Sequence, residues 1–297
     1  MNALKWFVST FPEAFYPCHP DLVRHYNYIT VLGRQKASEQ SIIICGICRD
    51  VINNLRFNIA RIEKIGELFR EYKVVLYEND SKDGTKKLLK DWEEANKNVF
   101  IISEDLQTQK FTSVASFERA SLLAECRNKY LNFMNERFDS DYVMMLDVDI
   151  SGGWSYEGIC NTIGHIDWDV VGSNGLLYGF VDEHGNIVHS GDRAGRVFYD
   201  TYAFRRVSHP EPHSSEEINQ LVYNRGEPFV KVSSCFGGMA IYKRDAVRDV
   251  IYRSEPPNKA ACEHAYFHFD MAKLGFDKIY INPSQITLYS PVSYTEI

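Results

Sequence analysis

Alternating strand and helix patterns between Ser41 and Asp149 constrain the fold of this chain more than any other feature. Strand-length apolar runs take turns with helical patterns, in the order 42–47, 51–72, 73–77, 85–95, 99–103, 119–138 and 142–146. The pattern over 51–72 repeats its apolar residues at three- and four-residue steps, as an amphipathic helix does. Elements of these lengths in this order predict a mixed, mostly parallel α/β sheet flanked by helices.

The second half of the chain has a different pattern, richer in short strands. We expect strands at 169–173, 229–232 and 278–281, and a hairpin between 176–182 and 187–190. A long polar loop is expected over 205–227, followed later by the segment 235–242 and a helix at 261–274. Residues 1–40 have no clear period and are predicted to form an N-terminal extension with short helices packed on the core. The remainder, 41–297, is predicted to be one domain with halves at 41–150 and 151–297.

Composition excludes several classes of protein. The chain has 297 residues, 44% of them hydrophobic, and a net charge of −7 with no run of Lys and Arg, so nucleic acid binding is not expected. No run reaches the roughly 18 apolar residues of a membrane span, and the first residues do not resemble a secretory signal. We therefore expect a soluble or peripheral protein of the cytoplasm.

The seven cysteines are scattered along the chain. Cys45 and Cys48 form a C-x-x-C, but they lie in or just after an apolar strand, and no second such pair completes a zinc site. Buried, reduced thiols are the prediction, and they fit a reducing compartment.

The triplet Asp147-Val148-Asp149 directly follows the apolar run 142–146. Two carboxylates at the end of a buried strand are costly unless a cation or hydrogen-bond donors compensate them. Mg²⁺ and Mn²⁺ prefer such oxygen ligands and commonly bridge to substrate phosphates. Because the carboxyl ends of parallel strands meet at one edge, Arg49-Asp50 and Glu78-Asn79-Asp80 are expected to converge with the triplet.

Four further motifs have both a structural and a functional interpretation. Ser81-Lys82-Asp83-Gly84-Thr85 fits a capped loop, and Arg127-Asn128 fits an exposed helix face or an ion pair. Gly237-Gly238 fits a tight bend or the close approach of a ligand. Glu263-His264 fits the start of a helix or a catalytic carboxylate with a metal ligand. His268, one turn further on, is expected in the core or on the surface.

In their order along residues 41–289, these motifs resemble nucleotide-sugar glycosyltransferases of the GT-A fold, in particular family 2. The stretch 78–85 is also similar to that of the capsule-type fungal mannosyltransferases. The resemblance implies a GT-A, Rossmann-like sheet with a nucleotide-sugar-binding half, 41–150, and a smaller, β-rich acceptor-binding half, 151–297. The chain departs from the family at Glu78-Asn79-Asp80, where Asp-Asp-Gly is frequent, and at His264, where a second carboxylate is frequent.

The resemblance also implies roles for individual residues. A UDP- or GDP-sugar donor would be bound by Cys48, Arg49, Asp50, Glu78, Asp80, Arg127, Asp147 and Val148. Mn²⁺, or Mg²⁺, would be held by Asp147, Asp149 and His264. A glycan or other hydroxyl acceptor would contact Gly237, Gly238 and Glu263, with Glu263 as the general base of an inverting reaction. Kinship with the capsule-type enzymes implies retention instead.

Two other functions stay open at this level. A sugar-phosphate nucleotidyltransferase uses a related layout, but it needs a Gly-rich basic loop after the first strand, where residues 45–50 offer one Gly and one Arg. A non-catalytic nucleotide- or glycan-binding protein on a GT-A scaffold is the other. The sequence does not fix the donor base, the sugar, the acceptor or the oligomeric state.

Overall fold

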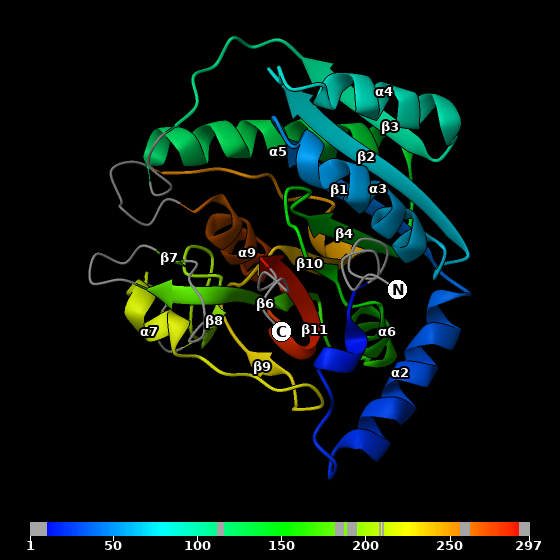
Figure 1. The fold of residues 1–297 in the computed structure, drawn as a ribbon, viewed down its shortest axis with the longest axis vertical. Helices are drawn as coiled ribbons and strands as arrows, with labels where there is room; N and C mark the ends of the chain where they lie inside the picture. The colour runs from blue at the N-terminus through cyan, green and yellow to red at the C-terminus, as the bar shows by residue number, and fades with distance from the viewer. Residues whose placement is uncertain are drawn as a thin grey trace.

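The structure is a computed structural model, and it describes residues 11–111, 116–181, 187–188, 195–207, 209, 211–255 and 262–290. The order of elements is strand–helix alternation followed by a strand-rich half (Figure 1). Helices are η1 (Glu13–Phe15), α2 (Val23–Ala37), α3 (Ile52–Gly66), α4 (Thr85–Ala95), α5 (Phe117–Arg137), α6 (Tyr156–Gly164), α7 (Ser215–Asn219), α8 (Arg244–Val247) and α9 (Glu263–Lys273). Strands are β1 (Ser41–Cys48), β2 (Glu71–Asn79), β3 (Val99–Glu104), β4 (Tyr142–Leu146), β5 (Gly153–Trp154), β6 (Val170–Val181), β7 (Ile187–Val188), β8 (Gly195–Phe198), β9 (Val230–Lys231), β10 (Met239–Lys243) and β11 (Ile279–Ser290).

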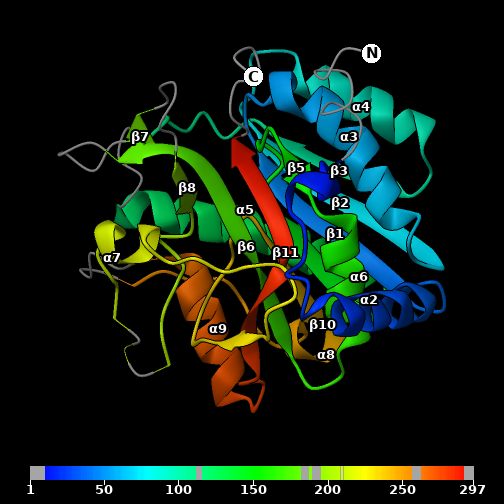
Figure 2. The same ribbon diagram turned by 60° about the horizontal axis from the view of Figure 1, so that its bottom comes forward.

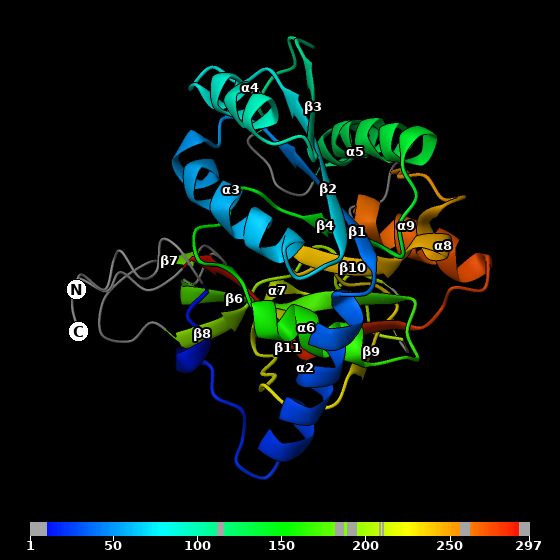
Figure 3. The ribbon, with the colours of Figure 1, turned by 90° about the vertical axis from the view of Figure 1, so that its right-hand side faces the viewer.

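One curved sheet runs through the molecule in the order β3-β2-β1-β4-β10-β6-β11-β5. Its first four strands are parallel to one another, β10 runs antiparallel to β4 and β6, and β6 is parallel to β11. Strands β6 and β11 lie side by side in Figure 2, and in Figure 3 they run across the direction of β1 and β2, so the sheet turns strongly between these strand pairs. The predicted α/β sheet with flanking helices is confirmed.

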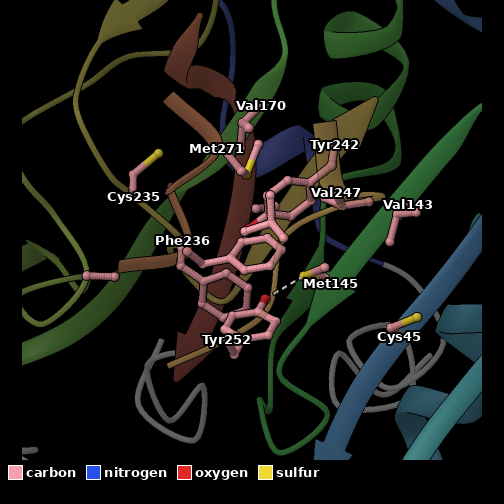
Figure 4. Close-up of a cluster of buried hydrophobic side chains, with 14 of the residues drawn as sticks. Cys45, Val143, Met145, Val170, Cys235, Phe236, Tyr242, Val247, Tyr252 and Met271 are labelled. Carbon is pink, nitrogen blue, oxygen red and sulfur yellow. Dashed lines mark hydrogen bonds between the residues drawn. The ribbon is translucent and has the colours of Figure 1, made fainter. Parts of the chain in front are cut away.

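The sheet is covered on both faces, which explains why its central strands are apolar throughout. Figure 3 shows α3 and α4 on one side of β1 and β2 and α5 on the other. Side chains of β1, β4 and α3 share one core cluster, and side chains of β1, β4, α5 and α9 share a second one on the opposite face. Figure 4 shows part of the second cluster, in which the Tyr252 hydroxyl lies 2.6 Å from the Met145 sulfur.

The second half differs from its prediction in several places. Strands expected at 169–173 and 176–182 are one strand, β6, because Asn174 and Gly175 also pair with β11, with Ile286 and Thr287. The final strand runs on to Ser290 through an irregularity between Asn282 and Ile286. The loop expected over 205–227 contains the short helix α7, which starts with a capping box between Ser214 and Glu217.

The N-terminal segment contains a longer helix than the short ones expected. The 15-residue helix α2 packs against α6, and an added Cβ on Gly33 would lie 1.7 Å from the carbonyl oxygen of Cys160. The two helix backbones therefore approach as closely as a glycine permits. Helix α6 was not predicted from the sequence.

The seven cysteines are all free thiols, and six are buried. Burial raises the pKa of Cys160 to about 11, so this thiol is protonated at neutral pH. The expected burial of Cys45 and Cys48 is confirmed.

Candidate active site

A cavity of about 430 Å³ opens at the carboxyl ends of β1 and β4. Asp147 and Asp149 lie in its wall, and so do four cationic side chains, Arg49, Lys110, Arg119 and Arg127. The other lining residues are Ile47, Cys48, Val51, Asn79, Gln109, Phe111, Leu122, Leu123, Cys126, Tyr199 and Tyr289. The cavity thus combines two carboxylates with a cationic wall.

Helix α3 holds the loop that carries the two carboxylates. The side-chain amide of Asn58 donates to the carbonyl oxygens of Val148 and Ile150, at 2.9 and 2.8 Å. Asn54, one turn earlier, donates to the carbonyl oxygen of Asp149. Asn58 is fully buried, so these bonds satisfy main-chain groups that would otherwise be left unpaired in the interior.

Asp147 is fixed from two sides. The Tyr289 hydroxyl donates to its Oδ2 at 2.6 Å, and Nη2 of Arg127 lies 3.8 Å from its Oδ1. The Tyr289 ring stacks on Tyr199 with 3.5 Å between ring centroids. The far end of β11 therefore reaches back to the loop after β4 and orients its first carboxylate.

The charge of Asp149 is only partly balanced, because Arg119 and Arg127 favour its ionisation while Asp147 opposes it. Its side chain reaches solvent, but loss of water around the carboxylate and the nearby charge of Asp147 together raise its pKa to about 6. Two carboxylates that oppose each other's ionisation in this way are relieved by a cation. The pair is therefore chemically suited to a divalent ion with oxygen ligands.

Arg127 and Glu263 form a buried ion pair between α5 and α9. Nε of Arg127 donates to Oε1 of Glu263 at 3.0 Å, and both side chains are almost completely buried. The guanidinium lies over two aromatic rings, 5.4 Å from the Phe236 centroid and 5.7 Å from the Tyr252 centroid. Arg127 lines the cavity whereas Glu263 does not, and Oε2 of Glu263 has no hydrogen-bond partner among the described residues.

The two histidines of α9 have different surroundings. The His264 ring stacks on Phe236 at 3.9 Å, and neither ring nitrogen has a hydrogen-bond partner in the described part of the chain. Burial, together with Arg127 and His268, holds the pKa of His264 well below its usual range, so the ring is neutral. His268 lies between the hydroxyls of Ser234 and Tyr242, at 2.9 and 3.0 Å, and burial lowers its pKa to about 3. The interior position expected as one option for His268 is confirmed.

The motif 81–85 ties two strand-end loops together. Three consecutive main-chain N–H groups at the start of α3, those of Asp50, Val51 and Ile52, donate to the side chains of Ser81, Thr85 and Asp83 at 2.9, 3.0 and 3.0 Å, respectively. Gly84 has a φ of 97°, in the left-handed region that glycine tolerates best. These side chains cap α3 from outside the helix, which is a structural role.

Glu78 and Asp80 brace the same region and do not line the cavity. Glu78 is buried and accepts from the Ser81 N–H and the Ser103 hydroxyl, at 2.7 and 2.5 Å. Asp80 accepts from the N–H and hydroxyl of Thr108 and from the Gln107 N–H. Burial opposes ionisation, but these bonds outweigh it and hold the pKa of Asp80 well below its usual range.

Arg49 lines the cavity, whereas Asp50 contacts neighbouring loop residues instead. Arg49 donates to the hydroxyl and carbonyl oxygens of Thr108, at 3.0 and 2.8 Å, and lines the cavity beside Cys48. Asp50 pairs with Lys110 and accepts from the Lys82 N–H, and it is not among the lining residues.

The glycine pair expected to meet an acceptor is packed against the protein itself. An added Cβ on Gly238 would lie 2.9 Å from the Tyr289 ring, and one on Gly237 would lie 2.1 Å from the Ser173 carbonyl oxygen. The buried carboxylate of Asp200 accepts from the Gly237 N–H at 2.9 Å, and the Gly238 carbonyl accepts from the Asp147 N–H at 3.0 Å. This turn therefore supports Asp147 and Tyr289.

Of the predicted donor and metal residues, five line the cavity: Cys48, Arg49, Arg127, Asp147 and Asp149. Asp50, Glu78, Asp80, Val148, Gly237, Gly238, Glu263 and His264 do not. Tyr289, Tyr199, Arg119 and Lys110 were missed. No sequence signal marks them, because contacts made only in the fold bring them to the cavity.

No group of three or more His, Cys, Asp or Glu side chains is arranged to hold a metal ion within the described residues. Asp147 and Asp149 thus supply two protein ligands at most in this arrangement. A Mg²⁺ or Mn²⁺ ion held by one or two carboxylates usually completes its ligand set with water and substrate phosphates.

Comparison with solved structures finds distant similarity. A mannosyltransferase, PcManGT from Pyrobaculum calidifontis, solved with GDP-Man and Mn²⁺, is 12% identical, with a TM-score of 0.42 over 89% of this chain and 67% of that one. TarS of S. aureus is 13% identical, with a TM-score of 0.45 over 84% of this chain and 60% of that one. GalNAc-T7, solved with UDP, GalNAc and Mn²⁺, is 12% identical, with a TM-score of 0.48 over 84% of this chain and 44% of that one.

The comparison with curated proteins gives no match. Within the described residues, no helix combines the length and the apolar character that crossing a bilayer requires. The comparison with protein families matches residues 58–270 to the family described as Cryptococcal mannosyltransferase 1. This match spans well over half of the chain and includes the D-x-D triplet and most of α3 and α9. The chain therefore belongs to the Cryptococcal mannosyltransferase 1 family, and it is a glycosyltransferase.

Proposed function

We propose that this glycosyltransferase moves a sugar, with mannose as the first candidate, from a nucleoside-diphosphate donor to a hydroxyl acceptor, with a divalent cation at Asp147 and Asp149. The observation that carries the proposal is the cavity in which these two carboxylates face Arg49, Lys110, Arg119 and Arg127. A diphosphate has concentrated negative charge, which such a wall attracts. Mannose is named because the family's description contains it.

Mn²⁺ or Mg²⁺ would be held by Asp147 and Asp149. We do not favour His264 as a third ligand, because its ring is buried and stacks on Phe236. When bound, the cation neutralises charge on the diphosphate as the glycosidic bond breaks. The chain's own contribution is orientation, since Tyr289 and Arg127 fix Asp147 while α3 fixes the loop. The raised pKa of Asp149 supports this choice of site.

Arg127 is the cation best placed to act on the leaving diphosphate. Its Nε is occupied by Glu263, while Nη1 has no hydrogen-bond partner among the described residues and the side chain lines the cavity. A planar guanidinium held at one nitrogen can still donate from another. Glu263 thus keeps Arg127 oriented without contacting the cavity.

Glu263 remains our candidate for the general base. To act as one, it has to give up its ion pair with Arg127 and contact the acceptor hydroxyl instead. Its unpartnered Oε2 is the atom that would accept the proton. The anomeric configuration of the product, read by NMR, tests this role, because a base of this kind belongs to an inverting reaction. A retained configuration would leave Glu263 with the positioning role alone.

The proposal is tested by binding and turnover together. Thermal unfolding is followed with GDP-mannose, UDP-mannose and UDP-glucose, each with Mn²⁺ or with EDTA, and release of nucleoside diphosphate is measured. A donor at about 100 times its Kd should stabilise the fold by roughly 2.7 kcal/mol. Asp149→Ala should abolish release and keep the fold, while Asp21→Ala, at an exposed carboxylate, should change neither.

Two results would contradict the proposal. Full activity of the Asp149→Ala variant with EDTA present would show that the reaction needs no cation at this site. Donor-dependent stabilisation without any release, in the presence of several hydroxyl acceptors and water, would favour a nucleotide-sugar-binding protein without catalysis.

A further inference from the structure

Helix α2 exposes its large apolar side chains, the reverse of what an ordinary surface helix does. Its buried positions are occupied by small or hydroxyl-bearing residues: Tyr26, Thr30, Gly33 and Ala37. Its opposite face exposes Tyr28, Val31 and Leu32, with 62%, 65% and 38% of their surface accessible. Surface helices normally turn their large apolar residues inward, so this outer face is unusual.

A further exposed apolar residue, Ile166, lies near the start of the helix. Ile166 is 79% accessible, and it borders the same cavity as Leu22 and His25, which lie at the start of α2. Figures 1 and 3 show α2 at the edge of the molecule, with no labelled element covering its outer side. We call the surface formed by Tyr28, Val31, Leu32 and Ile166 the α2 face.

Positive charge surrounds the α2 face. The helix contains Arg24, Arg34 and Lys36 and no acidic residue, although the chain as a whole has a net charge of −7. These three cations make no ion pair with a described residue, and the nearest carboxylates in sequence, Asp21 and Glu39, lie outside the helix. Lys243 adds a fourth cation, because its Nζ donates to the Ile166 carbonyl at 3.2 Å and it borders the same cavity as Lys36.

The acidic residues near Lys36 and Lys243 are already engaged. Asp141 accepts from the main-chain N–H of Ser41 at 2.7 Å, and Asp139 and Asp245 lie 3.3 and 3.7 Å from Arg248. Arg24, Arg34 and Lys36 are therefore not matched by any acidic residue of α2 itself, in a chain whose net charge is −7.

We propose that the α2 face docks on an anionic lipid surface, with Tyr28, Val31 and Leu32 entering the headgroup region and the cations contacting lipid phosphates. Exposed apolar residues next to basic ones, on a helix without acidic residues, are features of an interfacial helix. A second copy of the chain fits less well, because a two-fold contact would bring the same unbalanced cations together. The proposal is independent of the donor site.

The experiment is co-sedimentation of the full chain with vesicles of phosphatidylcholine alone or mixed with phosphatidylserine. The chain should bind the mixed vesicles and release from them as salt is raised. Replacing Tyr28, Val31 and Leu32 together by Ser should weaken binding at least about tenfold. Arg24→Gln and Lys36→Gln should each weaken it about fivefold, the effect of one basic residue near a charged membrane surface.

A matched control replaces Val222, Ile251 and Leu274 together by Ser, since these are also exposed apolar residues but lie outside α2. This variant should bind as the unaltered chain does. No binding to either vesicle, or equal loss in both triple variants, would overturn the proposal. So would sedimentation equilibrium that finds a dimer which only the α2 variant disrupts, because the face would then belong to a second copy.

Discussion

Asp149 illustrates how a second carboxylate nearby affects the folding stability of the protein. With a folded-state pKa of about 6 against an ordinary value of 3.8, this carboxyl binds its proton more tightly in the folded than in the unfolded chain. Folding stability therefore falls as pH rises between these two values, and the full cost is present above pH 6. Such costs are usual at functional sites.

We accordingly expect Asp149→Asn to stabilise the cation-free protein at pH 7.5 and to have little effect near pH 4. The gain should be roughly 1 kcal/mol, because solvent at this exposed side chain screens the repulsion. Urea unfolding in EDTA at both pH values measures it, with Asp21→Asn as the control at an exposed site. An equal gain at both pH values would mean that ionisation of Asp149 is not the cause.

Tyr289→Phe removes one hydroxyl and keeps the stacked ring. Loss of the 2.6 Å bond to Asp147 should weaken binding of Mn²⁺ with nucleoside diphosphate by about tenfold or more, as for other residues that orient a metal ligand. Calorimetric titration with GDP and Mn²⁺ measures the effect. Tyr28→Phe, at an exposed tyrosine away from the cavity, should bind as before, and unchanged affinity of Tyr289→Phe would show that Asp147 needs no such support.

At the scale of elements, the Arg127–Glu263 pair joins α5 to α9. Breaking a buried pair leaves one charge uncompensated, so Glu263→Leu alone should cost about 3–5 kcal/mol of folding stability. Arg127→Met with Glu263→Leu should recover much of that loss, because the double variant leaves no buried charge. Denaturant unfolding of both single variants and the double variant gives the coupling energy. Additive losses would mean that the pair contributes no coupling.

The contact between α2 and α6 depends on a missing side chain. Gly33→Ala would place a methyl group 1.7 Å from the Cys160 carbonyl oxygen, which the two helices can accommodate only by moving apart. We expect a loss of about 3 kcal/mol, at the upper end of the usual cost of overpacking. Gln35→Ala, on the exposed side of the same helix, should unfold at the same denaturant concentration as the unaltered chain.

Elements with a strong period were predictable, and elements that depend on partners were not. The helix at 85–95 was predicted with the bounds of α4, since its apolar spacing and Gly84 are local signals. Helix α6 was missed although Ser155 caps it, because its nine residues are short and Gly158 interrupts the pattern. The break expected between 173 and 176 is absent, because pairing with β11 keeps Asn174 and Gly175 extended.

The residues of the candidate site were likewise predictable only where a local sequence pattern marks them. Asp147 and Asp149 could be identified because they follow a strand whose apolar run is readable. Tyr199 and Tyr289 are 90 residues apart and meet only when the sheet curves, so no local pattern relates them. Glu78 and Asp80 were assigned to the donor from their position at a strand end, but their oxygens are used by neighbouring loops.

For the whole molecule, the thiols offer a simple test of the core. All seven cysteines are free, and Cys18 alone is not buried. In denaturant, seven thiols should react with Ellman's reagent, whereas in the native protein Cys18 should react first and the others only as fast as the protein opens. A reductant should leave the unfolding midpoint unchanged. Fewer than seven thiols in freshly purified, denatured protein would indicate a disulfide that the structure does not contain.

The asparagines of α3 bind the loop after β4 through its main chain. Asn54 and Asn58 contact carbonyl oxygens, which every amino acid has, so the path of the loop does not depend on which side chains it displays. The exposed side chain of Asp149 can therefore be exchanged for others while the frame persists, whereas Val148 and Ile150 are buried in the core. Under the proposed function, position 149 is thus a suitable place to alter cation preference by design, provided that Asn58 is left in place.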